Sequence, residues 1–354
     1  MRSPLFEKPL VMPHGLDAAL AASKAQFPQQ AKGVEQYFKR IDTVRQAVTG
    51  GGHYIRGGSQ VLSDRLVTII REAGGEVQAG REVETILLDG NRMRGVRHRA
   101  RNTGDVREEL APVAFGNAAP SVLAAMLPDD KRATFMSRYQ GRRPSISLWT
   151  MSLGLRAHSH DFGVCHYSTS ILPSWLTTLS RFRDAAAVLG DDSQSRITPY
   201  SFVAYDQIDS GLNTDGPYLA ALVGLDRVQN WAGLTAEAKH ARKERWMDRV
   251  IADLDRQFPG IAGAIVHREM STSETFQHYL NTPGGSLYGF APESRGFMPL
   301  AATAINGLYL ASAFTGSGGF TGAILGGGWA ARAAMRADDS AHAQTRASSF
   351  DLAQ

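Results

Sequence analysis

A cluster of glycines near the C-terminus has the spacing of a ligand-binding loop. Gly316, Gly318, Gly319 and Gly322 follow the apolar run LYLAS and precede the segment AILGGGWAARAAMR. We interpret these parts as a buried strand, a tight loop and a helix. Few side chains cover the first helical turn, so its free N–H groups and the helix dipole can meet an anionic or electron-rich group. A tight turn, with Gly326–Gly328 allowing close packing, explains the loop alone equally well.

The glycine loop is not a P-loop, because no Lys-Ser or Lys-Thr pair follows the glycines. A second candidate is Arg56, which stands beside two glycines ahead of an expected helix and could hold a phosphate or a substrate. A plain strand-to-helix turn explains that stretch as well. The densest basic run, 239–245, falls on the polar side of an expected helix, and we interpret it as a solvated face.

Two histidine-containing stretches are weak candidates for chemistry. His158 and His160 lie two residues apart, but no carboxylate or cysteine cluster completes a metal site, so we expect surface histidines and no metal. Cys165 next to His166 looks like half of a nucleophile pair, without a third group to orient it. The sequence has no G-x-S-x-G elbow and no H-E-x-x-H motif. We therefore assign no catalytic side chain.

The elements that position these residues change in type along the chain. Residues 16–48 have helical spacing with a break at Pro28. A helix is expected after Ser59, with one apolar face, and it stops at Gly74 and Gly75. Two strands joined by the turn 89–91 follow, and then the short run APVAFGNAAP predicts a buried strand.

The middle of the chain predicts strands and the end predicts a helix. Residues 145 to about 230 are rich in aromatic and β-branched residues, which favour strands. Trp246, Val250, Leu254 and Phe258 recur every four residues and predict an amphipathic helix that Pro259 ends. The first and last thirds look like parts of one domain, with the middle as an insertion.

Composition limits the class of protein. The chain has 354 residues, 43% of them apolar and 20% charged, which is ordinary for a soluble globular protein. The net charge of +4 is spread along the chain, so nothing favours nucleic-acid binding. The single cysteine rules out a disulfide within the chain. No apolar run approaches the roughly 20 residues of a membrane-spanning helix. We expect a cytoplasmic protein, with peripheral membrane contact left open.

Four segments in order resemble one family of flavoproteins. They are the stretches from GGGHYIRGGSQVLSDRLVTIIREAGGEV to ILLD, APVAFGNAAPSVLAAMLP, FPGIAGAIVHREMSTSETFQHYLNTPGGSLYGF, and GLYLASAFTGSGGFTGAILGGGWAA. Together they are similar to phytoene desaturases, all-trans-retinol saturases and carotenoid isomerases. The likeness runs from about residue 13 to residue 335 and is weak between 150 and 235. Their order and spacing carry the resemblance, and Ala311-Ser312 departs from the family's usual Ala-Gly or Thr-Gly.

The resemblance implies FAD as cofactor and a set of site residues. The closing strand, loop and helix would face the flavin ring, where a helix N-terminus stabilises the negative charge of reduced flavin. Val83 would offer its backbone to the adenine. The ring would be lined by Ser312, Thr315, Gly318, Gly319, Phe320, Thr321 and Gly322.

The substrate implied by the resemblance is a small apolar polyene of the carotenoid or retinoid kind. Arg56 and Tyr288 are the substrate-binding residues that we expect. The aromatics Trp149, Trp175, Phe202 and Tyr205 are further candidates to line an apolar tunnel, although such residues are usually plain core.

One feature of the family is missing. Its members open with a βαβ unit that carries G-x-G-x-x-G and seats the FAD pyrophosphate, and this sequence contains no such fingerprint. The expected fold is α/β with α+β insertions. It comprises an incomplete Rossmann-like FAD-binding domain of the flavin amine-oxidase-like type and a mixed-sheet substrate domain.

The expected domains are a helical segment of the substrate region, an FAD-domain part with a β-meander, a substrate domain, a C-terminal FAD-domain part and a flexible tail. Their bounds are 1–48, 49–122, 123–290, 291–336 and 337–354.

The expected function is FAD-dependent saturation, desaturation or isomerisation of carbon–carbon double bonds in a polyene. The alternative is a truncated, non-catalytic remnant or an apolar-ligand binding module that needs a partner chain for FAD. A flavin amine oxidase ranks below both, because no clear aromatic pair surrounds an amine site. The sequence leaves the substrate, the reaction direction, the electron acceptor and the oligomeric state open.

Overall fold

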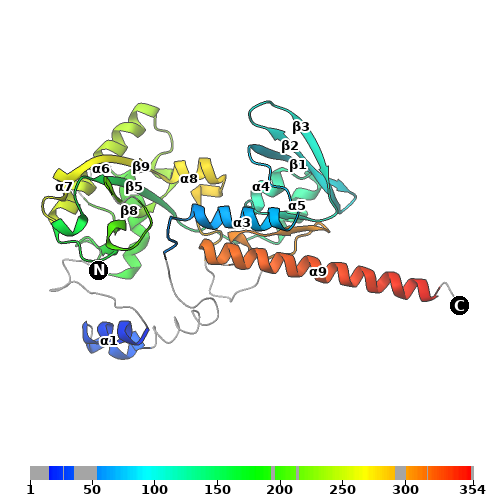
Figure 1. Ribbon diagram of the computed structural model, residues 1–354, viewed down its shortest axis with the longest axis horizontal. Coiled ribbons are helices and arrows are strands. Elements are labelled where there is room, and N and C mark those ends of the chain that lie inside the picture. The colour runs from blue at the N-terminus through cyan, green and yellow to red at the C-terminus, as the bar shows by residue number, and fades with distance from the viewer. Residues whose placement is uncertain are drawn as a thin grey trace. The chain divides into compact units, whose positions relative to one another are not determined.

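The chain divides into two units in a computed structural model that describes residues 16–26, 28–35, 54–192, 196–212, 215–291, 300–316 and 318–351 (Figure 1). The first unit comprises residues 1–75 and 147–275, and the second comprises residues 76–146 and 276–354. The domain bounds expected from the sequence remain a prediction. The helix expected over 31–48 lies mostly outside the described residues.

The first unit is built around a five-stranded sheet. Its strands are β5 (Ser147–Leu155), β6 (Ser168–Ile171), β7 (Tyr200–Ala204), β8 (Tyr218–Asp226) and β9 (Ile265–Ser271). Their order is β6-β7-β8-β5-β9, and every neighbouring pair is antiparallel. Its helices are α1 (Leu16–Gln26), α3 (Gln60–Glu72), α6 (Ala236–Gln257) and α7 (Ile261–Ala264), while α8 (Ser273–Leu280) crosses the division. Single 3-10 turns are η1 (Pro28–Gln30), η2 (Ser159–Phe162), η4 (Tyr205–Gln207) and η5 (Val228–Asn230), and a longer one is η3 (Leu179–Gly190).

The expected amphipathic helix is confirmed as α6, and it closes the core of this sheet. Thr235 caps it by accepting a hydrogen bond from the Ala238 N–H, and the helix ends at Gln257, ahead of Pro259. The apolar residues that recur every four positions pack against the sheet beside Trp149 and Phe202, which are completely buried. Trp149 and Phe202 are therefore core side chains, since no part of either reaches solvent.

A buried carboxylate links three segments of the first unit. Asp226, at the end of β8, accepts hydrogen bonds from the Asn230 amide (2.7 Å), the Trp231 indole (2.8 Å) and the Ser273 N–H (2.9 Å). Burial raises the pKa of this carboxyl, while the three donors act in the opposite direction. The network ties the 3-10 turn η5 and the start of α8 to the sheet.

The raised pKa of Asp226 predicts a pH dependence of stability. The folded state holds the Asp226 proton more tightly than the unfolded chain, whose aspartate pKa is about 3.9. This contribution to the free energy of unfolding is therefore complete below that pH and is lost as pH rises through the folded pKa. We expect the stability of the wild type relative to Asp226→Asn to fall as pH rises from about 4. Urea unfolding of both proteins across pH checks this, and a difference that rises with pH would contradict it.

The second unit contains two small sheets. The expected hairpin is confirmed: β1 (Arg81–Asp89) pairs antiparallel with β2 (Arg92–Ala100), which pairs with β3 (Val106–Leu110). The parallel pair is β4 (Ala114–Gly116) with β10 (Leu308–Leu310). Two helices, α4 (Pro120–Ala125) and α5 (Asp129–Ser137), lie between these strands in sequence, and α9 (Gly319–Asp351) closes the chain. The 3-10 turns are η6 (Pro283–Gly285) and η7 (Ala313–Thr315).

Three expectations differ from the structure. The run around β4 was expected to be buried, but Phe115 on this strand is 50% exposed. The helix α3 forms where its apolar spacing predicts, yet none of its residues is buried within the described part of the chain. The closing helix continues to Asp351, beyond the end at Arg336 that the sequence suggests. Local spacing sets the element types, whereas burial depends on what packs against each element.

Candidate functional site

The glycine loop begins with a turn that is closed by its own hydroxyl groups. Strand β10 is fully buried and leads into η7 through Ser312. The Ser312 hydroxyl accepts from the Phe314 N–H at 3.2 Å, and Thr315 Oγ1 accepts from the Ser312 N–H at 3.1 Å. The Thr315 hydroxyl in turn donates to the Leu310 carbonyl at 3.0 Å. Ser312 and Thr315 are both buried, so in this geometry they shape the turn.

Two glycines bring other backbone segments against the loop. A Cβ atom on Gly318 would collide with the Tyr288 carbonyl oxygen and would lie 2.5 Å from the Tyr288 Cβ. A Cβ atom on Gly326 would lie 2.7 Å from the Ser312 carbonyl oxygen. Gly327 has open space around it. The packing expected of residues 326–328 therefore belongs mainly to Gly326, while Gly318 forms a close seam with Tyr288.

The first turn of α9 presents backbone and apolar surface. Gly319 is its first residue, with a left-handed φ of 74° and the Tyr288 ring next to it. Phe320 is 63% exposed, Thr321 is half-buried and Gly322 is buried. A helix N-terminus with so little side chain over it allows a flat, electron-rich ligand to approach the backbone. The structure thus brings together Tyr288 and the glycine-loop residues singled out in the sequence.

An aromatic stack lies beneath this loop, and sequence reasoning did not find it. Tyr139 stacks on Phe290 with ring centroids 6.1 Å apart, and Phe290 meets Phe314 of η7 edge-on at 5.0 Å. Burial raises the pKa of Tyr139 to about 12, which makes ionisation of its phenol still less favourable. The three rings come from separate parts of the chain, and no local spacing signals their contact. They supply an apolar floor under the turn.

Val83 lies in the same unit, on β1, which is an edge strand of its sheet. The pairing with β2 shifts register between Val83 and Thr85, a bulge that re-aims the strand locally. An edge strand leaves backbone groups on its outer side for other partners. This geometry is compatible with the backbone contact that the resemblance implies for Val83.

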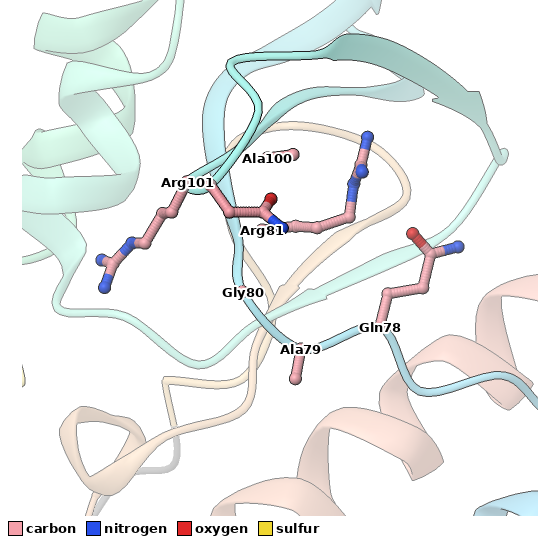
Figure 2. Close-up of a pocket in the computed structure, with 7 residues that line it drawn as sticks. Gln78, Ala79, Gly80, Arg81, Ala100 and Arg101 are labelled. Atoms are coloured by element: carbon pink, nitrogen blue, oxygen red, sulfur yellow. The ribbon is translucent and has the colours of Figure 1, made fainter.

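A pocket of about 470 Å³ opens beside the start of β1. It is lined by Gln78, Ala79, Gly80, Arg81, Ala100, Arg101 and Asn102. Figure 2 shows the Arg81 and Gln78 side chains extending to one side of the loop, with Arg101 extending to the other. The Arg81 Nε donates to His98 Nδ1 at 2.6 Å, which fixes the guanidinium. The pocket therefore combines amide and guanidinium groups two residues from Val83.

Arg56 belongs to the first unit, so the structure does not group it with Tyr288. Its Nε donates to both Asp209 carboxylate oxygens at 3.0 Å, in an exposed ion pair. The Gly57 N–H also donates to the Ser210 carbonyl at 2.7 Å, which holds this turn to the loop after η4. Tyr205 packs beside it, 5.5 Å from the Tyr54 ring. The Arg56 guanidinium is already paired here with a carboxylate.

The weaker candidates are explained by neighbouring residues. His158 stacks on Tyr218 at 3.9 Å and faces Asp206 at 3.5 Å. Among the described residues, no group of three histidines, cysteines or carboxylates could hold a metal ion. Cys165 is exposed.

The basic run is not only a solvated face. Arg242 is buried, where it donates to the Asn230 carbonyl and pairs with Asp192 at 2.7 Å. Lys239 also pairs with Glu274. Within the described ranges, no helix is long and apolar enough to span a membrane.

Comparison with known proteins identifies homologues. No family model matches the chain. It is 28% identical to a chloroplastic prolycopene isomerase of Arabidopsis thaliana over 283 residues, which covers 76% of this chain and 43% of that protein. It is 26% identical to the lycopene-forming phytoene desaturase of Pantoea ananas, covering 81% of this chain and 57% of that one. Among solved structures, an oxidoreductase from Methanosarcina mazei matches at a TM-score of 0.49 and 18% identity, covering 77% of this chain and 53% of that one.

These homologues agree with the resemblance that the four motifs carry. The chain is homologous to carotenoid isomerases and desaturases. It spans about half the length of the curated relatives that it matches.

Proposed function

We propose that this chain, a homologue of prolycopene isomerases and phytoene desaturases, forms the ring-binding part of an FAD-dependent oxidoreductase. The substrate would be an apolar polyene of the carotenoid kind, changed at its carbon–carbon double bonds. The observation that carries the proposal is the glycine loop, where Gly318 packs closely against the Tyr288 backbone and Gly319 opens α9 beside the Tyr288 ring. A bulkier residue at Gly318 would collide with the Tyr288 backbone.

The residues present suit the flavin ring. Bound FAD would supply the hydride chemistry at the double bond, so few side chains need to react. The backbone N–H groups at the start of α9 and the helix dipole would stabilise negative charge on the ring. Tyr288 and Phe320 would provide flat apolar surface beside it. The buried turn from Ser312 to Thr315 would keep the loop in shape.

The adenine end of the cofactor would lie at the edge of β1. Val83 would offer its backbone there, and the neighbouring pocket would receive polar parts of the nucleotide. Its amide and guanidinium groups suit ribose hydroxyls or phosphate oxygens. Because the sequence contains no G-x-G-x-x-G fingerprint, the pyrophosphate would depend on a βαβ unit outside this sequence.

The first unit would contribute to substrate binding. Tyr205 and Trp175 are half-buried, so parts of their rings can meet a ligand, and Arg56 follows two residues after Tyr54, whose ring contacts Tyr205. We also propose peripheral contact with the membrane in which such a polyene dissolves. Tyr279, at 80% exposure, and Leu280 at the end of α8 are the apolar residues that would make this contact.

Flavin titration of the purified chain tests the function. We expect FAD and also lumiflavin, which is the ring without the nucleotide, to shift the visible flavin band and quench its fluorescence. Both should compete for one site, because the ring-binding part lies in this chain. Adenosine monophosphate should not displace lumiflavin. If the visible band and the fluorescence of both flavins stay unchanged with the chain at millimolar concentration, the proposal is wrong.

A further inference from the structure

The turn that carries Tyr288 is held by two hydroxyl groups in series. The Tyr288 N–H donates to Ser145 Oγ at 2.9 Å, and Ser145 Oγ lies 2.9 Å from Ser286 Oγ. The Ser286 hydroxyl donates to the Gly289 carbonyl at 2.7 Å. Because the Ser286 proton is used in that bond, Ser145 is the donor between the two serines. The other acceptor near the Ser145 hydroxyl, the Ile146 carbonyl, is farther away at 3.5 Å, so the shorter contact with Ser286 is the stronger one.

Backbone bonds hold the same turn to residues 144–146. The Ser145 N–H donates to the Gly289 carbonyl at 2.8 Å, and the Leu287 N–H donates to the Ile146 carbonyl at 3.2 Å. Pro144 and Phe290 form an antiparallel bridge beside them. Ser286 is only 2% exposed, so its hydroxyl depends on these protein partners.

The turn has an unusual backbone. Asn281, Gly284, Gly285 and Gly289 all have a left-handed φ, between 50° and 68°. Asn281 is the one residue other than glycine with positive φ in the described part of the chain. Glycine adopts this conformation without strain and asparagine tolerates it, so the shape of the turn follows from its residue types.

The opposite side of the turn abuts the glycine loop. A Cβ atom on Gly289 would collide with the Ala313 carbonyl oxygen and lie 2.6 Å from the Ala313 carbonyl carbon. The Tyr288 backbone meets Gly318 in the same way, while the Tyr288 ring lies in van der Waals contact with the Cβ position of Gly319. The turn is therefore fixed between the two serines and the loop, and its Tyr288 side chain remains 43% exposed.

We propose that Ser145 and Ser286 are positioning residues that hold Tyr288 against Gly318 and Gly319 and so fix one wall of the candidate site. The ligand at that wall, the flavin ring, rests on the proposed function. The hydrogen bonds that position Tyr288 are present in this chain without any ligand. The positioning role of the two serines and the proposed function can therefore fail separately.

Ser145→Ala tests the hold directly. Without flavin, we expect the Tyr288 amide to exchange its hydrogen about fivefold faster, the usual effect of losing one hydrogen bond. With lumiflavin, we expect about fivefold weaker binding and a changed visible spectrum at saturation. Ser145→Thr keeps the hydroxyl and should restore both readouts. Ser286→Ala should also speed amide exchange at Tyr288 and weaken lumiflavin binding. It provides the test if Ser145→Ala does not fold.

A matched control is the hydroxyl pair of Ser170 and Ser201 in the first unit, 3.3 Å apart. Ser170→Ala removes a similar contact and should leave Tyr288 exchange and flavin binding unchanged. The proposal is overturned if Ser145→Ala leaves amide exchange at Tyr288 unaltered, or if Ser170→Ala changes flavin binding equally. If amide exchange at Tyr288 accelerates while no flavin binds to any variant, the positioning role of the serines is supported and the proposed function is wrong.

Discussion

Gly318→Ala is expected to reduce flavin affinity about five- to 150-fold. The added Cβ would overlap the Tyr288 carbonyl oxygen and would lie 2.5 Å from the Tyr288 Cβ. Neither of these atoms can rotate away. The turn at Tyr288 or the start of α9 must shift to relieve the collision. Overpacking of this kind costs about 1–3 kcal/mol, equivalent to roughly five- to 150-fold in binding if it is relieved in the free protein only. Lumiflavin titration of wild type and variant measures the change.

Gly327→Ala is the matched control for this prediction. It lies on α9, the helix that begins one residue after Gly318, and its added Cβ would meet no atom within 4 Å. Alanine in a helix interior is about 0.5–1 kcal/mol better than glycine, so this variant should be slightly more stable and bind flavin normally. Equal flavin affinities for Gly318→Ala and Gly327→Ala would show that the seam with Tyr288 does not shape the site.

Trp149→Ala is expected to lower the free energy of unfolding by about 3–5 kcal/mol, the usual cost of removing a large buried ring. Trp149 has no exposed surface, and its ring lies against Gly224, where a Cβ would be 2.5 Å from the indole nitrogen. The surrounding strands cannot close the cavity easily, because β5 and β8 are paired along their full lengths. Chemical denaturation monitored by circular dichroism measures the loss.

Trp149→Phe separates volume from hydrogen bonding. Among the described residues, the Trp149 indole nitrogen has no hydrogen-bond partner, so phenylalanine removes an unsatisfied donor while keeping most of the ring. We expect a loss within about 1.5 kcal/mol. A loss as large as that of the alanine variant would mean that the indole N–H has a partner. Trp175→Ala, at a half-buried position, should cost less than Trp149→Ala because less area is buried there.

Elements with strong local spacing could be predicted from the sequence. The helix around Trp246 and the hairpin over 81–100 depend on periodicity and on a turn at Gly90, all within short windows. The strand, loop and helix at the C-terminus were found for the same reason. Their functional meaning came from the order of four motifs, since the glycine loop alone fits a plain packing turn.

Contacts between distant segments could not be predicted. The Asp226 network joins residues from three segments, and its acceptor looks like any aspartate at the end of a strand. The two serines behind Tyr288 lie far apart in the chain and carry no motif. Arg242 sits in a basic run that reads as solvated, yet it is buried against Asp192. Such positions are set by tertiary packing, which local sequence patterns do not reveal.

The parallel pairing of β4 with β10 has a consequence for the order of folding. Its register joins Leu308 to Ala114, and the turn at Tyr288 likewise depends on Ser145. Contacts between residues so far apart in the chain close slowly, because the intervening polypeptide must lose its freedom first. Hairpin β1–β2 and helix α6 need only local contacts and can form early. The glycine loop is therefore expected to take its ligand-binding shape among the last events of folding. A ligand that arrives before this step would find no binding site.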